Sequence, residues 1–138
     1  RICIYAILSD KQSGESFVFM NTHLGFGNEC QKKSVALICD YAKKISSLPT
    51  FITGDFNMTP DSEAYTDITK EMKDANALTV NDMRSTFHGY APKQHTNMHI
   101  DYCFIDSKTT AIDSKIIDEL VDGKFPSDHY GLYTELEI

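Results

Sequence analysis

Hydrophobic and polar positions follow one another in the pattern of a domain that contains both strands and helices. Two apolar segments, residues 2–8 and 17–24, flank a polar segment that contains Gly14, which predicts an antiparallel hairpin. Between Gln31 and Leu48 apolar residues recur at steps of three and four, which predicts an amphipathic helix that ends before Pro49.

The pattern continues with a short apolar strand over residues 51–53 and a second helix over residues 61–72, where Pro60 suits the first turn. Further strands are predicted for residues 85–88, 99–106, 115–120 and 130–138, with a loop over residues 89–98. Strands interrupted by helices predict an α/β (α+β layered) domain, in which two helices pack on one face of a mixed, mostly antiparallel sheet.

Composition is that of a globular chain of one domain. The 138 residues are 41% hydrophobic and 24% charged, and this length suits a single core. Thirteen Lys and Arg against twenty Asp and Glu give a net charge of −7, which disfavours non-specific binding to nucleic acid because phosphate contacts need cationic side chains. No apolar segment approaches the ~20 residues of a membrane helix, and the compartment, cytoplasmic or exported, stays open.

Asp101 stands out because it lies in an otherwise apolar predicted strand, residues 99–106. Both faces of this strand are apolar, so both are predicted to be buried. Burying an unpaired carboxylate costs several kcal/mol, so Asp101 needs a cation, a metal ion or strong hydrogen-bond donors. A carboxylate that only accepts hydrogen bonds from backbone or tyrosine groups is the structural alternative.

Other polar residues lie where apolar strands end. Asp55 and Asn57 are two residues apart and share one face of an extended chain, although a plain turn is the alternative because both residue types favour turns. His23 ends the second apolar segment, on a face that begins apolar and becomes polar, as in a strand that leaves the core and enters a cleft. Asp128 and His129, taken alone, resemble a solvated loop.

Several short motifs are more specific in combination than any one of these residues. They are NTHL at 21–24, GDFN at 54–57, TFHGY at 86–90, IDY at 100–102 and SDH at 127–129. In this order they resemble the endonuclease/exonuclease/phosphatase superfamily, the fold of pancreatic deoxyribonuclease and of the abasic-site endonucleases. The TFHGY motif resembles the simpler bacterial members and the deadenylase-related branch.

The resemblance implies both a fold and a reaction. The fold would be a four-layer α/β sandwich, of which this chain is the C-terminal half, and the reaction would be Mg²⁺-dependent hydrolysis of a phosphoester, with Mn²⁺ as the alternative metal. His129 matches the histidine that activates the attacking water or holds the scissile phosphate. Asp101 matches the carboxylate that orients it, and a histidine held in this way keeps the tautomer that accepts a proton from water.

The remaining motif residues are expected at the substrate and the metal. His23 matches a histidine that donates to a phosphate oxygen, and Asp55 and Asn57 match the pair that orients nucleophile and phosphate. Asp55 is also expected at a metal, and Asp128 matches the carboxylate beside the catalytic histidine, at or near the metal. Two further motif residues are expected to contact the substrate: Asn21 and His88.

The chain departs from the family in one respect. Family members carry an N-terminal half with an early Asn motif and a Glu that is the principal magnesium ligand, and neither can be placed in residues 1–20; Glu15 does not match. We therefore expect residues 1–138 to form the C-terminal part of one domain, with an exposed apolar sheet face and little activity alone. The other half would belong to a longer protein or to a separate chain, or a second copy would cover the face.

Two function classes compete. The first is a phosphoester hydrolase (phosphodiesterase, nuclease or phosphatase) whose substrate, a nucleic acid, a nucleotide or a lipid headgroup, is undetermined; the acidic charge disfavours long duplex DNA. The second is a non-catalytic binding or scaffold module, which would not require this whole set of polar motif residues. An abasic-site nuclease is disfavoured because His23 lies where that branch typically carries a tyrosine.

Overall fold

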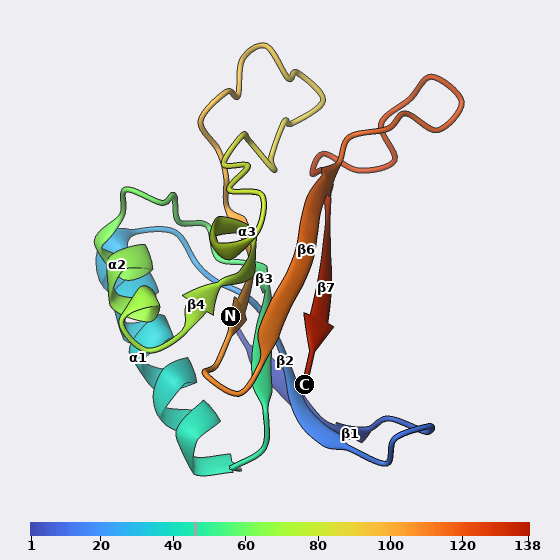
Figure 1. The fold of residues 1–138 in the computed structure, drawn as a ribbon. Helices are drawn as coiled ribbons and strands as arrows, with labels where there is room; N and C mark the ends of the chain where they lie inside the picture. Colours follow the sequence, from blue (N-terminus) through green and yellow to red (C-terminus); the bar gives the residue numbers. More distant parts are fainter. Residues whose placement is uncertain (46) are drawn as a thin grey trace.

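A five-stranded mixed sheet forms the centre of the molecule, with helices α1 and α2 on one side of it and a second, two-stranded sheet on the other (Figure 1). The computed structural model describes residues 1–45 and 47–138. In spatial order the strands of the first sheet are β1 (Cys3–Ser9), β2 (Ser16–His23), β3 (Thr50–Asp55), β5 (Asp101–Ile105) and β4 (Lys73–Asp74). The second sheet contains β6 (Thr110–Ile117) and β7 (Gly131–Glu137), and the helices are α1 (Asn28–Ile45), α2 (Glu63–Thr69) and α3 (Ala75–Leu78).

Side chains alternate between the two faces of the first sheet. Val18 of β2, Ile52 of β3 and Phe104 of β5 are fully buried in the main core, which the two longer helices cover. The opposite face contributes Cys103 to a smaller core, against which Leu132 of β7 packs. The alternation predicted for the second apolar segment is confirmed, because successive residues of β2 alternate between more buried and more exposed positions, and the exposed ones lie at its polar end.

Strands β2 and β3 run parallel, because α1 carries the chain back between them. Their carboxyl ends therefore meet at one edge of the sheet. There Thr22 pairs with Gly54, whose φ is +147°, and a Cβ at residue 54 would lie 1.9 Å from the carbonyl oxygen of Thr22. Only glycine allows this close approach, which brings the following residue, Asp55, beside His23.

The layered α/β fold is confirmed, with differences in detail. The second helix is shorter than predicted and begins after Ser62, whose hydroxyl accepts the N–H of Tyr65. The predicted strand at 85–88 is wrong: the segment forms an isolated bridge between Phe87 and His129 and backbone hydrogen bonds to Met98, Asp128 and Tyr130, in place of the regular ladder of a strand. The strand predicted at 115–120 lies earlier, at Thr110–Ile117, because a register irregularity near Asp113 breaks the alternation that marks a strand. The short elements β4 and α3 were not predicted.

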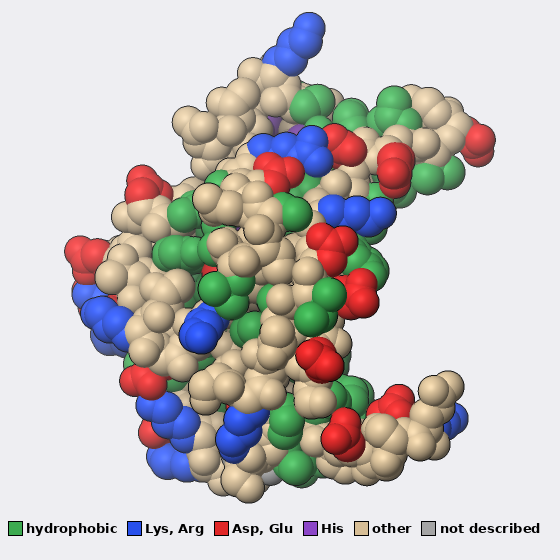
Figure 2. Space-filling view, viewed as in Figure 1, with side chains coloured by type: hydrophobic (Ala, Val, Ile, Leu, Met, Phe, Trp, Pro, Cys, Tyr) green, Lys and Arg blue, Asp and Glu red, His purple; other side chains and the backbone are tan. Residues whose placement is uncertain are grey.

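Strand β1 forms an open edge of the sheet. Its side chains are exposed on both faces, among them Ile4 (59% exposed) and Tyr5 (56% exposed), although the sequence is apolar. Figure 2 shows the molecule hollowed on the side of the second sheet, with hydrophobic and acidic side chains inside the hollow. Within the residues that the structure describes, no helix is both long enough and apolar enough to span a membrane.

Candidate active site

Strand register places three of the predicted site residues in one row across the sheet. His23 at the end of β2 pairs with Asp55 at the end of β3, and Asp55 pairs with Asp101 at the start of β5. Two carboxylates directly opposite one another repel and destabilise a sheet unless a positive charge lies between or beside them. The row therefore requires a cationic partner.

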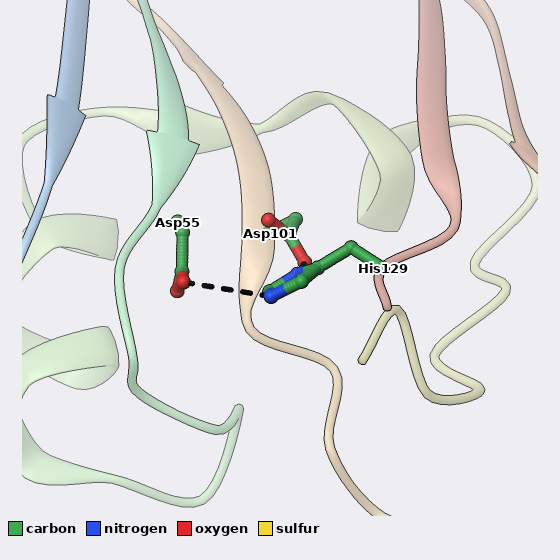
Figure 3. Close-up of side chains that lie close together, drawn as sticks. All are labelled: Asp55, Asp101 and His129. Atoms are coloured by element: carbon green, nitrogen blue, oxygen red, sulfur yellow. Dashed lines mark hydrogen bonds and ion pairs between the residues drawn. The ribbon is translucent and has the colours of Figure 1, made fainter. Parts of the chain in front are cut away.

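His129 supplies one such partner from the segment that precedes β7 (Figure 3). Its Nδ1 lies 2.8 Å from Oδ2 of Asp101, and its Nε2 lies 3.9 Å from Oδ2 of Asp55. Because a carboxylate can only accept, Nδ1 carries the hydrogen of this bond. The partner of the half-buried Asp101 is thus a histidine, whose Nε2 is left facing Asp55.

The charges of this cluster shift the pKa of His129. Burial disfavours the imidazolium form, but the hydrogen bond to Asp101 and the negative charges of Asp101, Asp55 and Asp128 outweigh it, so the pKa of His129 lies above its ordinary value. A histidine held by a carboxylate in this way is a group that can exchange protons.

Asp55 sits between two histidines. Its Oδ2 lies 3.3 Å from Nε2 of His23, and its Oδ1 accepts the N–H of Asn57 at 2.8 Å. Burial raises the pKa of Asp55, the hydrogen bond from Asn57 opposes that shift, and the charge of Asp101 adds to it. A bound cation would favour the ionised carboxylate further.

The cluster has the donor chemistry of a site for a hard divalent cation. Asp55, Asp101 and His129 each offer a ligand atom, and these three atoms lie within 4.8 Å of one another. Carboxylate oxygens are the ligands that Mg²⁺ and Mn²⁺ prefer, and Mg²⁺ keeps several waters, so few protein ligands suffice. The residues present therefore fit a metal ion of this class.

Asn57 lies beside the cluster in a tight turn. Its φ is +51°, a left-handed conformation that asparagine tolerates better than most residues. Its side-chain amide donates to the carbonyl of Leu24 at 2.9 Å, and its own carbonyl accepts a hydrogen bond from Gln31 of α1. The turn alternative for this segment is therefore confirmed, and the turn directs the backbone N–H of Asn57 to Asp55. A contact of Asn57 with the substrate stays a prediction.

Two other predicted residues, Asn21 and His88, lie around the cluster rather than in it. Asn21 donates to the backbone oxygen of Thr53 at 3.2 Å and lines a groove of about 410 Å³ with Asp55 and Asp101. His88 is buried, and its ring packs against Phe125 and Tyr130. A substrate contact by His88 would need this packing to open, so that assignment has no support in the geometry.

The carboxylate of Asp128 does not converge with the other three groups. Its Oδ1 accepts from the hydroxyl of Ser127 at 3.3 Å, while its backbone carbonyl accepts the N–H groups of His88 and Gly89. Its charge still acts on the neighbouring His129. The role of Asp128 as a metal ligand therefore stays a prediction.

Phe87 is a neighbour of the site that no sequence pattern singled out. The centroid of its ring lies 5.0 Å from that of the His129 ring in an edge-to-face arrangement, and 5.0 Å from that of the His95 ring. The TFHGY motif contains Phe87, and the bridge and the ring contact between Phe87 and His129 show that this motif contacts His129.

Comparisons with known proteins agree with this geometry. A sequence model of the Endonuclease/Exonuclease/phosphatase family matches residues 32–129. An endonuclease/exonuclease/phosphatase from Bacteroides vulgatus is 31% identical, with a TM-score of 0.87 over 99% of this chain and 55% of that one. No curated protein matches the chain.

Two more distant structures share the fold. A mannosyl-6-phosphatase from Bacteroides thetaiotaomicron is 22% identical (TM-score 0.86), with 99% of this chain and 57% of that one covered. TDP2 of D. rerio, in complex with a single-strand DNA product, is 16% identical (TM-score 0.75), with 99% and 62% covered. The chain thus spans little more than half the length of these proteins. On its motifs, its fold and the extent of the family match, it belongs to the Endonuclease/Exonuclease/phosphatase family.

Proposed function

We propose that the chain provides one wall of the active site of a Mg²⁺-dependent phosphoester hydrolase, with Mn²⁺ as the alternative metal. The observation that carries the proposal is the pairing of His129 with Asp101, with the free Nε2 directed toward Asp55. Family membership supports a phosphoesterase of this kind. The geometry supplies the groups that such a reaction needs on this side of the substrate.

The proposed role of His129 is to accept a proton. A water molecule near Nε2 gives its proton to the ring while its oxygen forms a bond to phosphorus, and the bond from phosphorus to the leaving oxygen breaks. Asp101 holds Nδ1–H, keeps Nε2 free as the acceptor and stabilises the imidazolium that forms. His23, Asn57 and Asn21 are proposed to face the phosphate, where histidine and amide donors stabilise the added negative charge.

Asp55 is the residue of this chain that we propose to hold the divalent cation, with Asp128 as the second proposed ligand. When bound, such a cation neutralises charge on the phosphoester and polarises the phosphoryl oxygen. The principal carboxylate ligand of the family is expected in the part of the domain that lies outside residues 1–138. Burial and the charge of Asp101 raise the pKa of Asp55, and a bound cation would favour its ionised form.

We further propose that residues 1–138 are the C-terminal part of one domain and that the remaining half covers the open side of the sheet. Strand β1 carries exposed Ile4 and Tyr5, and Leu37 and Tyr41 of α1 are 62% and 60% exposed. A lone apolar edge strand is an aggregation hazard, which a neighbouring strand removes. The structural relatives have the additional length needed to supply one.

The substrate class follows from the site only in part. Among proteins of the same fold, one is a mannosyl-6-phosphatase and another binds a single-strand DNA product, so we propose both phosphomonoesters and phosphodiesters as candidate substrates. The net charge of −7 disfavours long duplex DNA. The competing proposal, a non-catalytic module, predicts that the cluster binds a phosphoester without hydrolysing it.

Hydrolysis of bis-p-nitrophenyl phosphate and p-nitrophenyl phosphate tests the proposal. The complete protein is expected to hydrolyse at least one of them with Mg²⁺, and to lose activity in EDTA. The matched variant Glu119→Ala, at an exposed residue of the 118–127 loop, should keep full activity, whereas His129→Ala should not. Binding without turnover would favour the non-catalytic module.

A further inference from the structure

Thr86 connects separate segments of the chain beside the Asp101–His129 pair. It is fully buried, and its hydroxyl oxygen accepts the N–H groups of Ile100 at 3.0 Å and of Asp101 at 3.1 Å. The hydroxyl hydrogen points to the carbonyl of Met98 at 3.4 Å. One donor and two acceptor positions are all that a hydroxyl offers, so this group is fully used.

The backbone of Thr86 also contacts the segment that carries His129, the partner of Asp101. Its carbonyl accepts the N–H of Tyr130 at 2.7 Å, and the next residue, Phe87, forms the bridge to His129. Thr86 therefore bonds to the amide of Asp101 on one side and to the amide that follows His129 on the other. Asp101 begins β5, whereas His129 lies in the segment before β7, and Thr86 bonds to both of these segments.

We propose that Thr86 is a positioning residue for the Asp101–His129 pair. Its hydroxyl fixes the start of β5, and with it the Asp101 carboxylate, against the segment that carries His129. A displacement of about 1 Å at such a pair costs on the order of 10²-fold in rate. The effect on turnover rests on the proposed function, whereas the effect on the geometry of the pair does not.

Three variants in the complete protein isolate the hydroxyl. Thr86→Val keeps the shape and removes the hydroxyl, and Thr86→Ser keeps the hydroxyl and removes the methyl. Thr50→Val is the matched control, because Thr50 is also buried and donates to a backbone carbonyl, that of Leu48 at 3.0 Å, at the opposite end of β3. If Thr86→Val does not fold, Thr86→Ala replaces it.

The first measurement is the tautomer of His129, read from a long-range ¹H–¹⁵N spectrum of protein with ¹⁵N-labelled histidine, in EDTA at a pH where the ring is neutral. The His129 signal is assigned with His129→Ala. Wild type, Thr86→Ser and Thr50→Val should show the Nδ1–H form, and Thr86→Val or Thr86→Ala should move toward the Nε2–H form. An unchanged tautomer in the variants that lack the hydroxyl would overturn the proposal.

The second measurement is hydrolysis of the p-nitrophenyl esters. Thr86→Val should lower kcat about 10- to 100-fold with little change in KM, and Thr86→Ser should restore it, as expected for misplaced catalytic groups. Equal losses in Thr86→Val and Thr86→Ser would contradict a role for the hydroxyl. A wild-type protein without hydrolase activity would overturn the proposed function, and the tautomer measurement would then decide alone on the positioning role.

Discussion

Asp101 and His129 are 28 residues apart and belong to different segments of the chain, yet Oδ2 of Asp101 lies 2.8 Å from Nδ1 of His129. Asp101 begins β5 in the first sheet, and His129 lies two residues before β7 of the second sheet. The contact joins the two layers at the edge where β2 and β3 also end. It gives the half-buried carboxylate of Asp101, which would be costly without a partner, a histidine to hold.

Replacing either partner tests the catalytic role of the pair. General acid–base catalysis contributes ~10²–10⁴-fold, so His129→Ala should lower kcat of the complete protein by at least about 10²-fold. Asp101→Asn should also lose activity with the fold intact, because an amide can favour the wrong tautomer of His129. Circular dichroism and steady-state kinetics check the two parts of this prediction. A loss below about tenfold in either variant would mean that the role is misassigned.

The pH dependence of turnover follows from the raised pKa of His129. The ring must be neutral to accept a proton, so activity should increase as pH rises through this raised pKa. Asp101→Asn removes the contact that most favours the imidazolium, so the midpoint of its residual activity should move to lower pH. A pH profile of kcat/KM for both proteins measures the shift. A midpoint that stays in place or rises in Asp101→Asn would contradict the assignment.

The raised pKa of His129 also predicts how the free energy of unfolding depends on pH. Because the folded-state pKa of His129 lies above that of the unfolded chain, the ion pair with Asp101 stabilises the fold fully below the unfolded value of about 6.5. This stabilisation is lost as pH rises through the folded-state pKa. Urea unfolding at several pH values should therefore show that the free energies of unfolding of wild type and His129→Ala differ less as pH rises. A difference that widened instead would contradict the raised pKa.

Asp55 is expected to control metal dependence. Asp55→Ala removes the carboxylate that faces both His23 and His129, so the complete protein should bind Mg²⁺ more weakly and should lose hydrolysis at Mg²⁺ concentrations that saturate wild type. Calorimetric titration with Mg²⁺ measures the first effect and kinetics the second. Glu119→Ala serves again as the control. Unchanged Mg²⁺ affinity in Asp55→Ala would remove Asp55 from the metal site.

Gly54 is expected to be irreplaceable for steric reasons. In Gly54→Ala the new Cβ would meet the Thr22 carbonyl oxygen at 1.9 Å, at a φ of +147°. The conformation alone costs ~1–3 kcal/mol for a residue with a side chain, so the free energy of unfolding should fall by about 3 kcal/mol or more once the clash is added. Gly131→Ala, where a Cβ would lie an ordinary 3.6 Å from Ile117, should change it little. Similar urea midpoints for the two variants would contradict this account.

Much of the site could be predicted from the sequence because its members lie at fixed places in regular strands. The alternation that ends in His23 predicted a strand that enters a cleft, and the apolar surroundings of Asp101 predicted a partner for its carboxylate. Strand pairing then aligned His23, Asp55 and Asp101 in a single row. The strand pattern also predicted the layered fold, since periodicity is a property of the chain itself.

The contributions of irregular segments could not be predicted in this way. Thr86 and Phe87 act through an isolated bridge and through side-chain hydrogen bonds to a distant strand, which leave no periodic signal. His88 was expected at the substrate but is buried against Phe125, because a loop from elsewhere in the chain closes over it. The positions of such residues depend on tertiary contacts.

Hydrolysis of the two p-nitrophenyl phosphates by the complete protein, by its His129→Ala variant and by residues 1–138 alone tests the central claim most directly. We predict Mg²⁺-dependent turnover by the complete protein that disappears in EDTA and in His129→Ala, and little or none by residues 1–138. Turnover in His129→Ala at the wild-type rate would contradict the assignment of the catalytic base. Turnover by residues 1–138 equal to that of the complete protein would contradict an active site divided between two halves of one domain.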